Sequence, residues 1–376
     1  MKTIFGYLTD GKLFFSACIT LLVGCAPSPK NETELTNIQP ILIGTYTNGL
    51  SEGIYQVSFD KKEGGLSNLR LVAESTNPSF LTVNNSADEV FAVTENDPGG
   101  LVIYARQPNG ELIKKSELPT EGIHPCHVDL NGDQNLVSVA NYSSGNVSLF
   151  QKTKESWALI HQFQHEGTGP NKDRQEGPHA HFNTFRRDNT LYAVDLGTDK
   201  VMGYKVLSDT TIDSFVAHQA EPGDGPRHLV FHPSQNFVFV VNELTNTVTS
   251  HRVTPEGTFS LIDRIDMLPE GFSAYSKAAD IHLSENGKYL YASNRGHNSI
   301  VIYEVSDEGE LELVGWQSEG IKTPRNFTLS PEGNHLLVAN QDANNIIVFA
   351  VEKDGTLSPT EHQIEVGSPV CLVFVP

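Results

Sequence analysis

Short apolar segments alternate with polar turns along almost the whole chain. Segments such as VFAVTEN (90–96), LVSVANY (136–142) and VFVVNEL (238–244) begin apolar and end near an asparagine or an acidic residue. Segments such as SIVIYEV (299–305) and LELVGWQ (311–317) follow at similar spacings, separated by turns such as SENGK. Short apolar runs bounded by Gly, Pro and Asn indicate β-strands rather than helices. The 31 glycines and 20 prolines agree with a turn-rich, all-β fold.

A proline precedes most of these groups of strands and marks a repeat. The aligned positions are Pro78, Pro125, Pro178, Pro226, Ala279 in place of a proline, Pro324 and Pro369. They lie 45 to 53 residues apart, and each unit carries four apolar segments. Four strands at this period are typical of one blade of a β-propeller. The sequence therefore predicts a seven-bladed β-propeller over residues 41–376, with four antiparallel strands in each blade.

The last repeat is incomplete, and the start of the chain supplies what it lacks. After Pro369 only one strand, VCLVFV (370–375), remains. The segments ILIGTYT (41–47), GIYQVSF (53–59) and LSNLRLVAES (66–75) match a second, third and fourth strand. We therefore predict that the ring closes by pairing the N- and C-terminal strands in one blade. Such closure removes the exposed sheet edges that promote aggregation.

The first 40 residues precede the repeats and indicate export. Residues 13–24 form an apolar run that is too short to span a bilayer and is typical of a secretory signal. The LVGC that ends at Cys25 resembles the lipobox of bacterial lipoproteins. We predict a lipoprotein signal peptide at 1–24, lipidation of Cys25, and a polar tether at 25–40. The alternative is an ordinary secretory signal in which the cysteine is incidental. Ala26 favours an outer-membrane anchor facing the periplasm.

Charge and motif content exclude several classes of function. The formal net charge of −20 makes nucleic acid an unfavourable partner. There is no nucleophile elbow, phosphate loop or dinucleotide fingerprint, so no cofactor is expected. Outside the signal segment, Cys126 and Cys371 fall in non-adjacent repeats, and we expect free, packed thiols. Apart from a lipid anchor, the expected partner is a small molecule.

Antiparallel strands bring two sets of residues to one mouth of the central channel. The first set consists of the residues after the aligned positions: Ser79, Cys126, His179, Arg227, Asp280, Arg325 and Val370. The second set ends the second strands: Tyr46, Glu95, Asn141, Asp195, Glu243, Asn294, Arg295 and Asn340. Turn chemistry alone explains the asparagines, since their side chains bond nearby backbone.

Arginines are over-represented at this mouth. Arg227, Arg295 and Arg325 form a cationic funnel in an acidic chain, which indicates an anionic ligand or a developing oxyanion. His179, Arg227, Glu243 and Arg295 come from three consecutive blades and could surround one small molecule. The alternative is a set of rim salt bridges in which Glu243 pairs with Arg227 or Arg295.

A metal site and a lid are two further possibilities at the mouth. His179 and His181 alternate along a strand and could share a metal ion, but the ligand set is incomplete, so we predict none. His127 and His228 are expected to be hydrogen-bonded core or interface residues. Two insertions, at 165–176 and 267–280, lengthen loops at the mouth. Such loops suit a lid or a specificity wall, with a tolerated surface insertion as the alternative.

Six segments together make the chain similar to a known family. ILIGTYT, GPHAHF, YAVDLGTDKV, GPRHLVFHP, VVNEL and YASNRGHNSI resemble the bacterial lactonase family of seven-bladed propellers. This family includes the propeller type of 6-phosphogluconolactonase and is related to fungal 3-carboxymuconate lactonizing enzyme. The resemblance implies catalytic roles for His179, Arg227, Glu243 and Arg295. We further predict that His181, Asp195, Asp280 and Arg325 bind the substrate. Whether His181 shares or replaces the role of His179 is open.

The resemblance implies a hydrolase that opens a sugar lactone. His179 is expected to be the general base, Arg227 and Arg295 to stabilise the oxyanion, and Glu243 to orient them or act as acid or base. The usual substrate of the family, 6-phosphogluconolactone, is cytosolic, so a sugar lactone met in the periplasm suits an exported chain better. The alternatives are a muconate-type lactone cycloisomerase and a non-catalytic, lipid-anchored propeller that binds ligands or acts as a scaffold.

Overall fold

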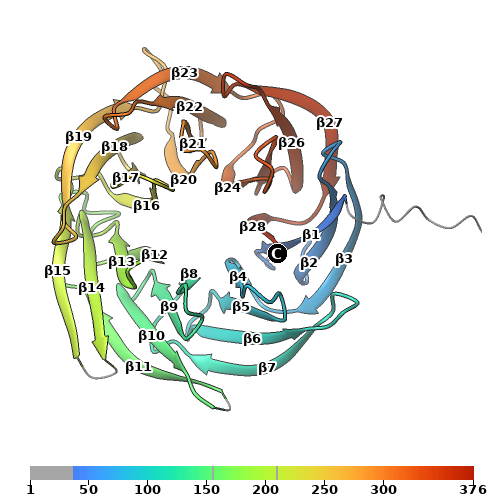
Figure 1. Ribbon diagram of the computed structural model, residues 1–376, viewed down its shortest axis with the longest axis horizontal. Helices are drawn as coiled ribbons and strands as arrows, with labels where there is room; N and C mark the ends of the chain where they lie inside the picture. Colours follow the sequence, from blue (N-terminus) through green and yellow to red (C-terminus); the bar gives the residue numbers. More distant parts are fainter. Residues whose placement is uncertain (1–36, 155, 209–210) are drawn as a thin grey trace, which may run out of the picture. The chain divides into compact units, whose positions relative to one another are not determined.

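Seven four-stranded antiparallel sheets are arranged in a ring (Figure 1). A computed structural model describes residues 37–154, 156–208 and 211–376, and residues 37–376 form one compact unit. The predicted all-β propeller of seven blades is therefore confirmed. The expected signal peptide, Cys25 and most of the expected tether lie outside the described residues. The described residues contain no helix that is both long and apolar enough to cross a membrane.

We number the blades from the one that contains both ends of the ring. Blade 1 contains β28 (Pro369–Phe374), β1 (Ile38–Thr45), β2 (Gly53–Asp60) and β3 (Leu66–Glu74). Blade 2 contains β4 (Leu81–Val83), β5 (Glu89–Thr94), β6 (Gly100–Arg106) and β7 (Leu112–Pro119). Blade 3 contains β8 (Pro125–Leu130), β9 (Leu136–Asn141), β10 (Asn146–Lys152) and β11 (Trp157–Gln164).

The other four blades follow in chain order. Blade 4 contains β12 (Ala180–Phe185), β13 (Thr190–Asp195), β14 (Lys200–Ser208) and β15 (Thr211–Gln219). Blade 5 contains β16 (Pro226–Phe231), β17 (Phe237–Asn242), β18 (Thr247–Val253) and β19 (Phe259–Asp266). Blade 6 contains β20 (Lys277–Leu283), β21 (Tyr289–Arg295), β22 (Ser299–Val305) and β23 (Leu311–Gln317). Blade 7 contains β24 (Pro324–Leu329), β25 (His335–Asn340), β26 (Asn345–Val351) and β27 (Leu357–Glu365).

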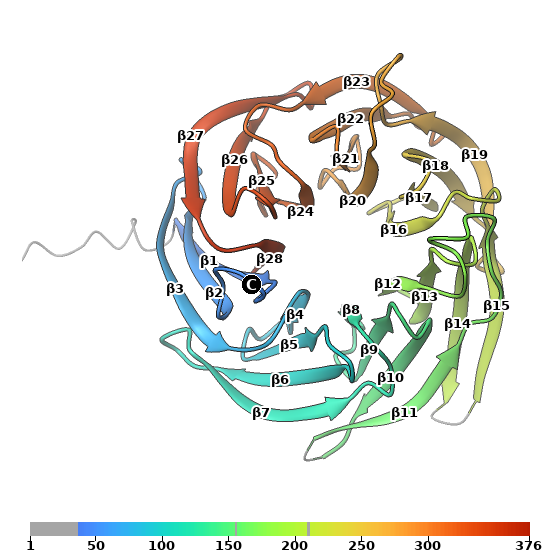
Figure 2. The same ribbon diagram turned by 180° about the vertical axis from the view of Figure 1, so that it is seen from behind.

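Blade 1 closes the ring as predicted. The C-terminal strand β28 pairs antiparallel with β1, with Ile41 opposite Phe374 and Gly44 opposite Cys371 (Figure 2). Two further hydrogen bonds join the ends: Val375 N donates to the Pro40 carbonyl at 2.9 Å, and Gln39 Nε2 donates to the Val375 carbonyl at 2.9 Å. The inner edge of blade 1 is therefore built from the last residues of the chain.

The core lies between neighbouring blades. Every residue of the second strands β9, β13, β17 and β25 is buried, because both faces of these strands meet another blade. The interface of blades 5 and 6, for example, buries Phe239, Leu290 and Tyr303 in one apolar cluster. Outer strands alternate between half-buried and exposed positions, as β27 does after its buried first residue. Cys126 and Cys371 are buried free thiols in different blades.

A β-bulge near the start of six of the innermost strands aims side chains at the channel. In blade 3, Pro125 lies opposite Asn141 and His127 lies opposite Ala140, so Cys126 has no partner in the ladder. Five other innermost strands contain a similar register shift. The residues that it leaves without a partner in the ladder are His181, Arg227, Ala279 with Asp280, Arg325 and Val370. A bulge changes the direction of the extra residue. The repeat therefore places one unpaired residue or pair from each of these blades at the mouth.

This register corrects the alignment of two repeats. Ala180 lies opposite Asp195 in blade 4, just as Pro226 lies opposite Asn242 in blade 5. The strand of blade 4 thus begins two residues after Pro178, and the residue equivalent to Arg227 is His181. In blade 6 the equivalent position is Ala278, one residue before the aligned Ala279.

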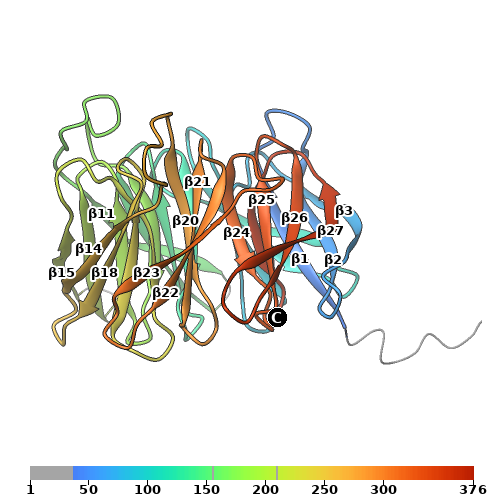
Figure 3. The same cartoon turned by 90° about the horizontal axis from the view of Figure 1, so that it is seen from above.

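The two faces of the ring differ. The first strands start, and the second strands end, at the face that carries the long loop between β11 and β12 (Figure 3). The C-terminus lies at the opposite face, and β1 also begins there because it runs toward the mouth.

Candidate active site

A small cavity lies at the mouth of the channel. The space between its lining residues, including the part open to solvent, is about 270 Å³. Five bulge residues line it, together with residues from the ends of second strands and from the channel wall: Cys126, His181, Arg227, Arg325, Val370, Tyr46, Ser79, Phe80, Glu95, His228 and Asn326. The cavity brings together most of the first set of expected mouth residues, but only Tyr46 and Glu95 of the second set.

Glu243 gathers three arginines beside this cavity. Its Oε2 lies 2.9 Å from Arg227 Nε and accepts a hydrogen bond from Arg295 at 2.7 Å. Its Oε1 accepts one from Arg174 at 2.6 Å. Arg227 also donates to the Ala279 carbonyl at 2.6 Å and is only 1% exposed. Glu243 thus pairs with Arg227 and Arg295, the two arginines considered as its partners from the sequence, and also with Arg174.

The arginines fix the charge of Glu243. Burial would raise its pKa, but Arg295, Arg227 and Arg174 together hold the pKa of Glu243 far below its usual value. Burial and the neighbouring Arg295 and Arg325 lower the pKa of Arg227 to about 9. Glu243 therefore stays ionised near neutral pH, and Arg227 stays largely protonated. Such a carboxylate orients guanidinium groups and is poorly suited to proton transfer.

Two histidines differ in their access to the cavity. His181 lines it, and its Nδ1 lies 4.0 Å from Cys126 Sγ, while its Nε2 has no hydrogen-bond partner among the residues that the structure describes. Burial and the charge of Arg227 lower the pKa of His181 well below its usual value. His179 lies at the rim, with Nδ1 3.1 Å from the Tyr142 carbonyl and Nε2 3.1 Å from Glu176. Its ring stacks on Tyr142, and it does not line the cavity.

Asp280 acts on the site through a histidine. Its Oδ1 accepts a hydrogen bond from His228 Nδ1 at 2.8 Å, and its Oδ2 contacts His282 and Asn326. His228 Nε2 in turn lies 3.1 Å from an NH1 donor of Arg227. Burial and Arg227 lower the pKa of His228 to about 4, although Asp280 opposes this. Asp280 is 3% exposed and does not line the cavity, in contrast to the expected direct substrate contact.

Asp195 is also turned away from the cavity. Its Oδ1 accepts hydrogen bonds from the backbone N–H groups of His179, Gly197 and Thr198. Its Oδ2 bonds His165 at 2.8 Å, and the side chain is fully buried. The reason is the loop before β12, which wraps around this carboxylate. Asp195 thus supports the backbone at the mouth rather than facing a ligand.

The opposite wall of the cavity carries a second carboxylate. Tyr46 donates to Glu95 at 3.0 to 3.1 Å, and Ser79 also donates to it. The Arg325 guanidinium lies 5.3 Å from the centre of the Tyr46 ring. Tyr46 and Glu95 were visible in sequence as ends of second strands, but nothing in the repeat indicated that they face each other.

The two inserted loops contribute cations that sequence reasoning missed. Arg174, from the loop before β12, reaches Glu243 and lies 3.4 Å from the Tyr142 hydroxyl. Lys277 follows the second loop and pairs with Arg295 in the ladder. Burial and Arg295 lower the pKa of Lys277 to about 8. The only available signal was the position of these residues inside the insertions.

Other predicted residues have structural roles. Asn141, Asn294 and Asn340 bond Ser148, Ser299 and Asn345 across nearby turns, as turn chemistry suggested. His127 packs between Phe80 and Phe182. Within the described ranges, no group of three or more His, Cys, Asp or Glu side chains is arranged to hold a metal ion.

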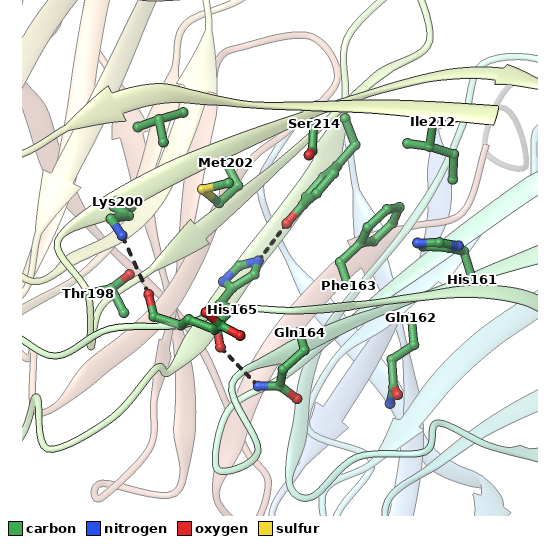
Figure 4. Close-up of a pocket in the computed structure, with 13 residues that line it drawn as sticks. His161, Gln162, Phe163, Gln164, His165, Thr198, Lys200, Met202, Ile212 and Ser214 are labelled. Carbon is green, nitrogen blue, oxygen red and sulfur yellow. Dashed lines mark hydrogen bonds between the residues drawn. The ribbon is translucent and has the colours of Figure 1, made fainter.

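A wider groove on the outside of the ring is a weaker candidate. It lies between β11 and β14–β15, and includes His165, Phe163 and Lys200 (Figure 4). His165 Nε2 lies 2.8 Å from the Tyr204 hydroxyl, and its Nδ1 is bonded to Asp195. Both ring nitrogens are therefore occupied. The unpartnered imidazole nitrogen and the grouped arginines occur at the channel mouth, which we take as the candidate active site.

Fold and site define a seven-bladed propeller with a cationic, imidazole-containing pocket at one mouth. Residues 40–374 match the family model described as "Lactonase, 7-bladed beta-propeller". The chain therefore belongs to the lactonase family of propeller enzymes.

Individual relatives agree with this assignment. The chain is 36% identical over 292 residues to a 6-phosphogluconolactonase of Bacillus subtilis, covering 76% of this chain and 83% of that protein. Among solved structures, a periplasmic gluconolactonase of Pseudomonas aeruginosa has a TM-score of 0.84 at 32% identity, covering 90% of this chain and 99% of that one. A structure described as a putative 6-phosphogluconolactonase from Bacteroides fragilis has a TM-score of 0.83 at 32% identity, covering 93% and 100%.

Proposed function

We propose that the protein hydrolyses a sugar lactone at the mouth of its channel. The observation that carries the proposal is that Arg227 and His181 line the same cavity. Arg227 is a fixed cation, held by Glu243, the Ala279 carbonyl and His228. His181 beside it is kept uncharged, because burial and Arg227 lower its pKa. A fixed cation and a neutral base are the two groups that ester hydrolysis by water requires.

In the first step, water attacks the lactone carbonyl carbon. His181 Nε2 takes a proton from the water as the new carbon–oxygen bond forms. The electron pair of the carbonyl double bond moves to its oxygen, and the Arg227 guanidinium stabilises the resulting negative charge. Arg295 and Arg174 do not need to touch the substrate in this scheme, since they hold Glu243, which orients Arg227.

In the second step, the tetrahedral intermediate opens the ring. The bond between the carbonyl carbon and the ring oxygen breaks, and that oxygen takes the proton from His181. The product is a hydroxy acid, which ionises near neutral pH. In this scheme Glu243, Arg295 and Asp280 are positioning residues, and His179 closes the rim by stacking on Tyr142.

The proposed location of the reaction is the periplasm. Support comes from the export signal expected at 1–24, with Cys25 as the expected lipid anchor, and from the periplasmic gluconolactonase among similar structures. The lipid would hold the chain at the outer membrane, and the substrate would be a soluble sugar lactone. No cofactor takes part.

The test measures acid release during lactone opening by the chain that begins at residue 26. Glucono-δ-lactone and its 6-phosphate are offered separately near pH 6.5, and the spontaneous rate is subtracted. We expect a clear enzymatic rate, and a loss of about 100-fold or more in kcat for Arg227→Gln, because one oxyanion donor is worth roughly that much. The matched control is Arg186→Gln, because Arg186 lies on the opposite face and pairs with Asp188 and Asn236.

Two histidine variants locate the base. His181→Ala is expected to reduce the rate to near the spontaneous background, whereas His179→Ala should keep most of it. The reverse result would assign the base to His179. No rate above background with either lactone, from a folded wild-type chain, would refute lactone hydrolysis of this type.

A further inference from the structure

The wall of the cavity opposite Glu243 is built from blades 1, 2 and 7. It consists of Tyr46, Ser79, Glu95 and Arg325, and we call it the Glu95 wall. None of these four side chains takes part in the proposed proton transfers. Their arrangement nevertheless differs from a set of rim salt bridges, because the acid and the base of this wall are not joined to each other.

Glu95 has acceptor capacity to spare. Its two hydrogen-bonding partners are the hydroxyl groups of Tyr46 and Ser79, which are both neutral. No lysine, arginine or histidine in the described ranges lies within ion-pair distance of its carboxylate. A carboxylate offers about four acceptor sites, and two hydroxyl protons leave some of them open. Burial also raises the pKa of Tyr46, so Tyr46 remains a donor toward Glu95.

Arg325 has donor capacity to spare. The other arginines of the site, Arg174, Arg227 and Arg295, all bond Glu243. Arg325 has a contact with the face of Tyr46 but, within the part of the chain that the structure describes, no hydrogen bond or ion pair. Burial would lower its pKa, but Tyr46 and Glu95 hold the pKa of Arg325 above its usual value. The N–H donors of this charged guanidinium therefore have no hydrogen-bond partner among the described residues, and those that face the cavity can bind a ligand.

We propose that the Glu95 wall binds the sugar hydroxyl groups of the lactone. Through this wall the site selects an unphosphorylated sugar lactone over its 6-phosphate. The inference deepens the proposed lactone hydrolysis and rests on it. Each sugar hydroxyl is both a donor and an acceptor, so adjacent hydroxyls match an open carboxylate beside an open guanidinium. A phosphate has acceptors and no donor at neutral pH, apart from its minor protonated form.

The charge of Glu95 opposes a phosphate at this wall. Arg325 alone would attract it, but the Glu95 carboxylate offsets that attraction and repels the phosphate oxygens. Placing like charges together is a common way to reject a wrong ligand.

The experiment compares kcat/KM for glucono-δ-lactone and for its 6-phosphate in wild type, Glu95→Gln and a control. We expect wild type to prefer the unphosphorylated lactone by at least about tenfold, a factor that corresponds to about 1.4 kcal/mol. Glu95→Gln keeps the shape but removes the charge, so this preference should fall by about tenfold, mainly through a higher KM for glucono-δ-lactone. The control is Glu319→Gln, at an exposed glutamate of another mouth loop, and it should leave the preference unchanged.

The outcomes separate this inference from the proposed function. A wild-type chain that opens neither lactone refutes the proposed function. A wild-type chain that prefers the 6-phosphate overturns the inference about the Glu95 wall while lactone hydrolysis stands. If Glu95→Gln folds and keeps the wild-type preference between the two lactones, the inference about the Glu95 wall is also overturned while lactone hydrolysis stands. If circular dichroism shows that Glu95→Gln does not fold, the wild-type preference alone decides, because it requires no variant.

Discussion

Replacing Glu243 with glutamine should destabilise the propeller strongly. Glu243 is 2% exposed, and its carboxylate joins Arg174, Arg227 and Arg295. Without the negative charge, two arginines that are 1% and 5% exposed lose their counter-ion and repel each other. Removing one partner of a buried ion pair costs about 3 to 5 kcal/mol.

This free energy corresponds to a measurable shift in melting temperature. Unfolding entropy is about 2.1 cal/mol/K per residue, which gives about 0.7 kcal/mol/K for the roughly 340 residues of the propeller. A loss of 3 to 5 kcal/mol therefore lowers Tm by about 4 to 7 °C. The assay is thermal unfolding followed by circular dichroism. The matched control is Glu89→Gln, because Glu89 pairs with Lys115 and Lys152, which are half-exposed, and such pairs contribute at most about 1 kcal/mol.

The pH dependence gives the sharper test of this reasoning. The pKa of Glu243 is depressed in the folded protein, so its stabilisation is fully present above the unfolded pKa of about 4.3 and is lost as the pH falls below it. The gap in Tm between wild type and Glu243→Gln should therefore be constant near neutral pH and shrink in acid. Two results would refute the stabilising role of Glu243 and its three arginines. One is a Glu243→Gln variant that melts within about 1 °C of wild type at pH 7, and the other is a difference in Tm that does not change in acid.

Three further predictions concern the same mouth. If His181 is the base, kcat/KM should be constant from pH 8 to 6 and fall only well below pH 6.5, because the pKa of His181 is lowered; a limb centred near 6.5 in a pH–rate profile contradicts this. Asp195→Asn should lower Tm by a few degrees, since Asp195 accepts hydrogen bonds from three backbone N–H groups and one from His165. This loss in Tm should become smaller in acid, because the pKa of Asp195 is depressed in the folded protein. Gly197→Ala should cost about 1 to 3 kcal/mol in denaturant unfolding, because the added Cβ would lie 1.9 Å from the Gly177 carbonyl oxygen; an unchanged midpoint would show that the loop yields freely.

The repeat made the architecture predictable from sequence. Each blade must bury its second strand against both neighbours, so the same apolar pattern returns in every unit and its period counts the blades. The missing strands of the last unit at the start of the chain also predicted the closure by β28 and β1. These features depend on backbone pattern and burial, which the order of residue types records directly.

The details of the site were less predictable because they depend on bulges and loops. Two extra residues before β12 shift the blade 4 register, so His181 occupies the position that the proline alignment gave to His179. The reach of Arg174 to Glu243 depends on the path of an inserted loop, which no period describes. Asp195 resembled the other strand-end residues in sequence, yet its carboxylate is consumed by backbone N–H groups. Residue type and spacing give the candidates at a mouth, but side-chain direction decides among them.

The first strand of the chain begins, and its last strand ends, at the face opposite the mouth, where Val375 is bonded to Pro40. A support attached at either end of the propeller would therefore join it at the face opposite the proposed active site. If Cys25 carries the proposed lipid, 12 residues separate it from Ile38, and a chain of this length spans at most about 45 Å. The same geometry suits immobilisation on a solid support, because a C-terminal linker leaves the mouth unobstructed.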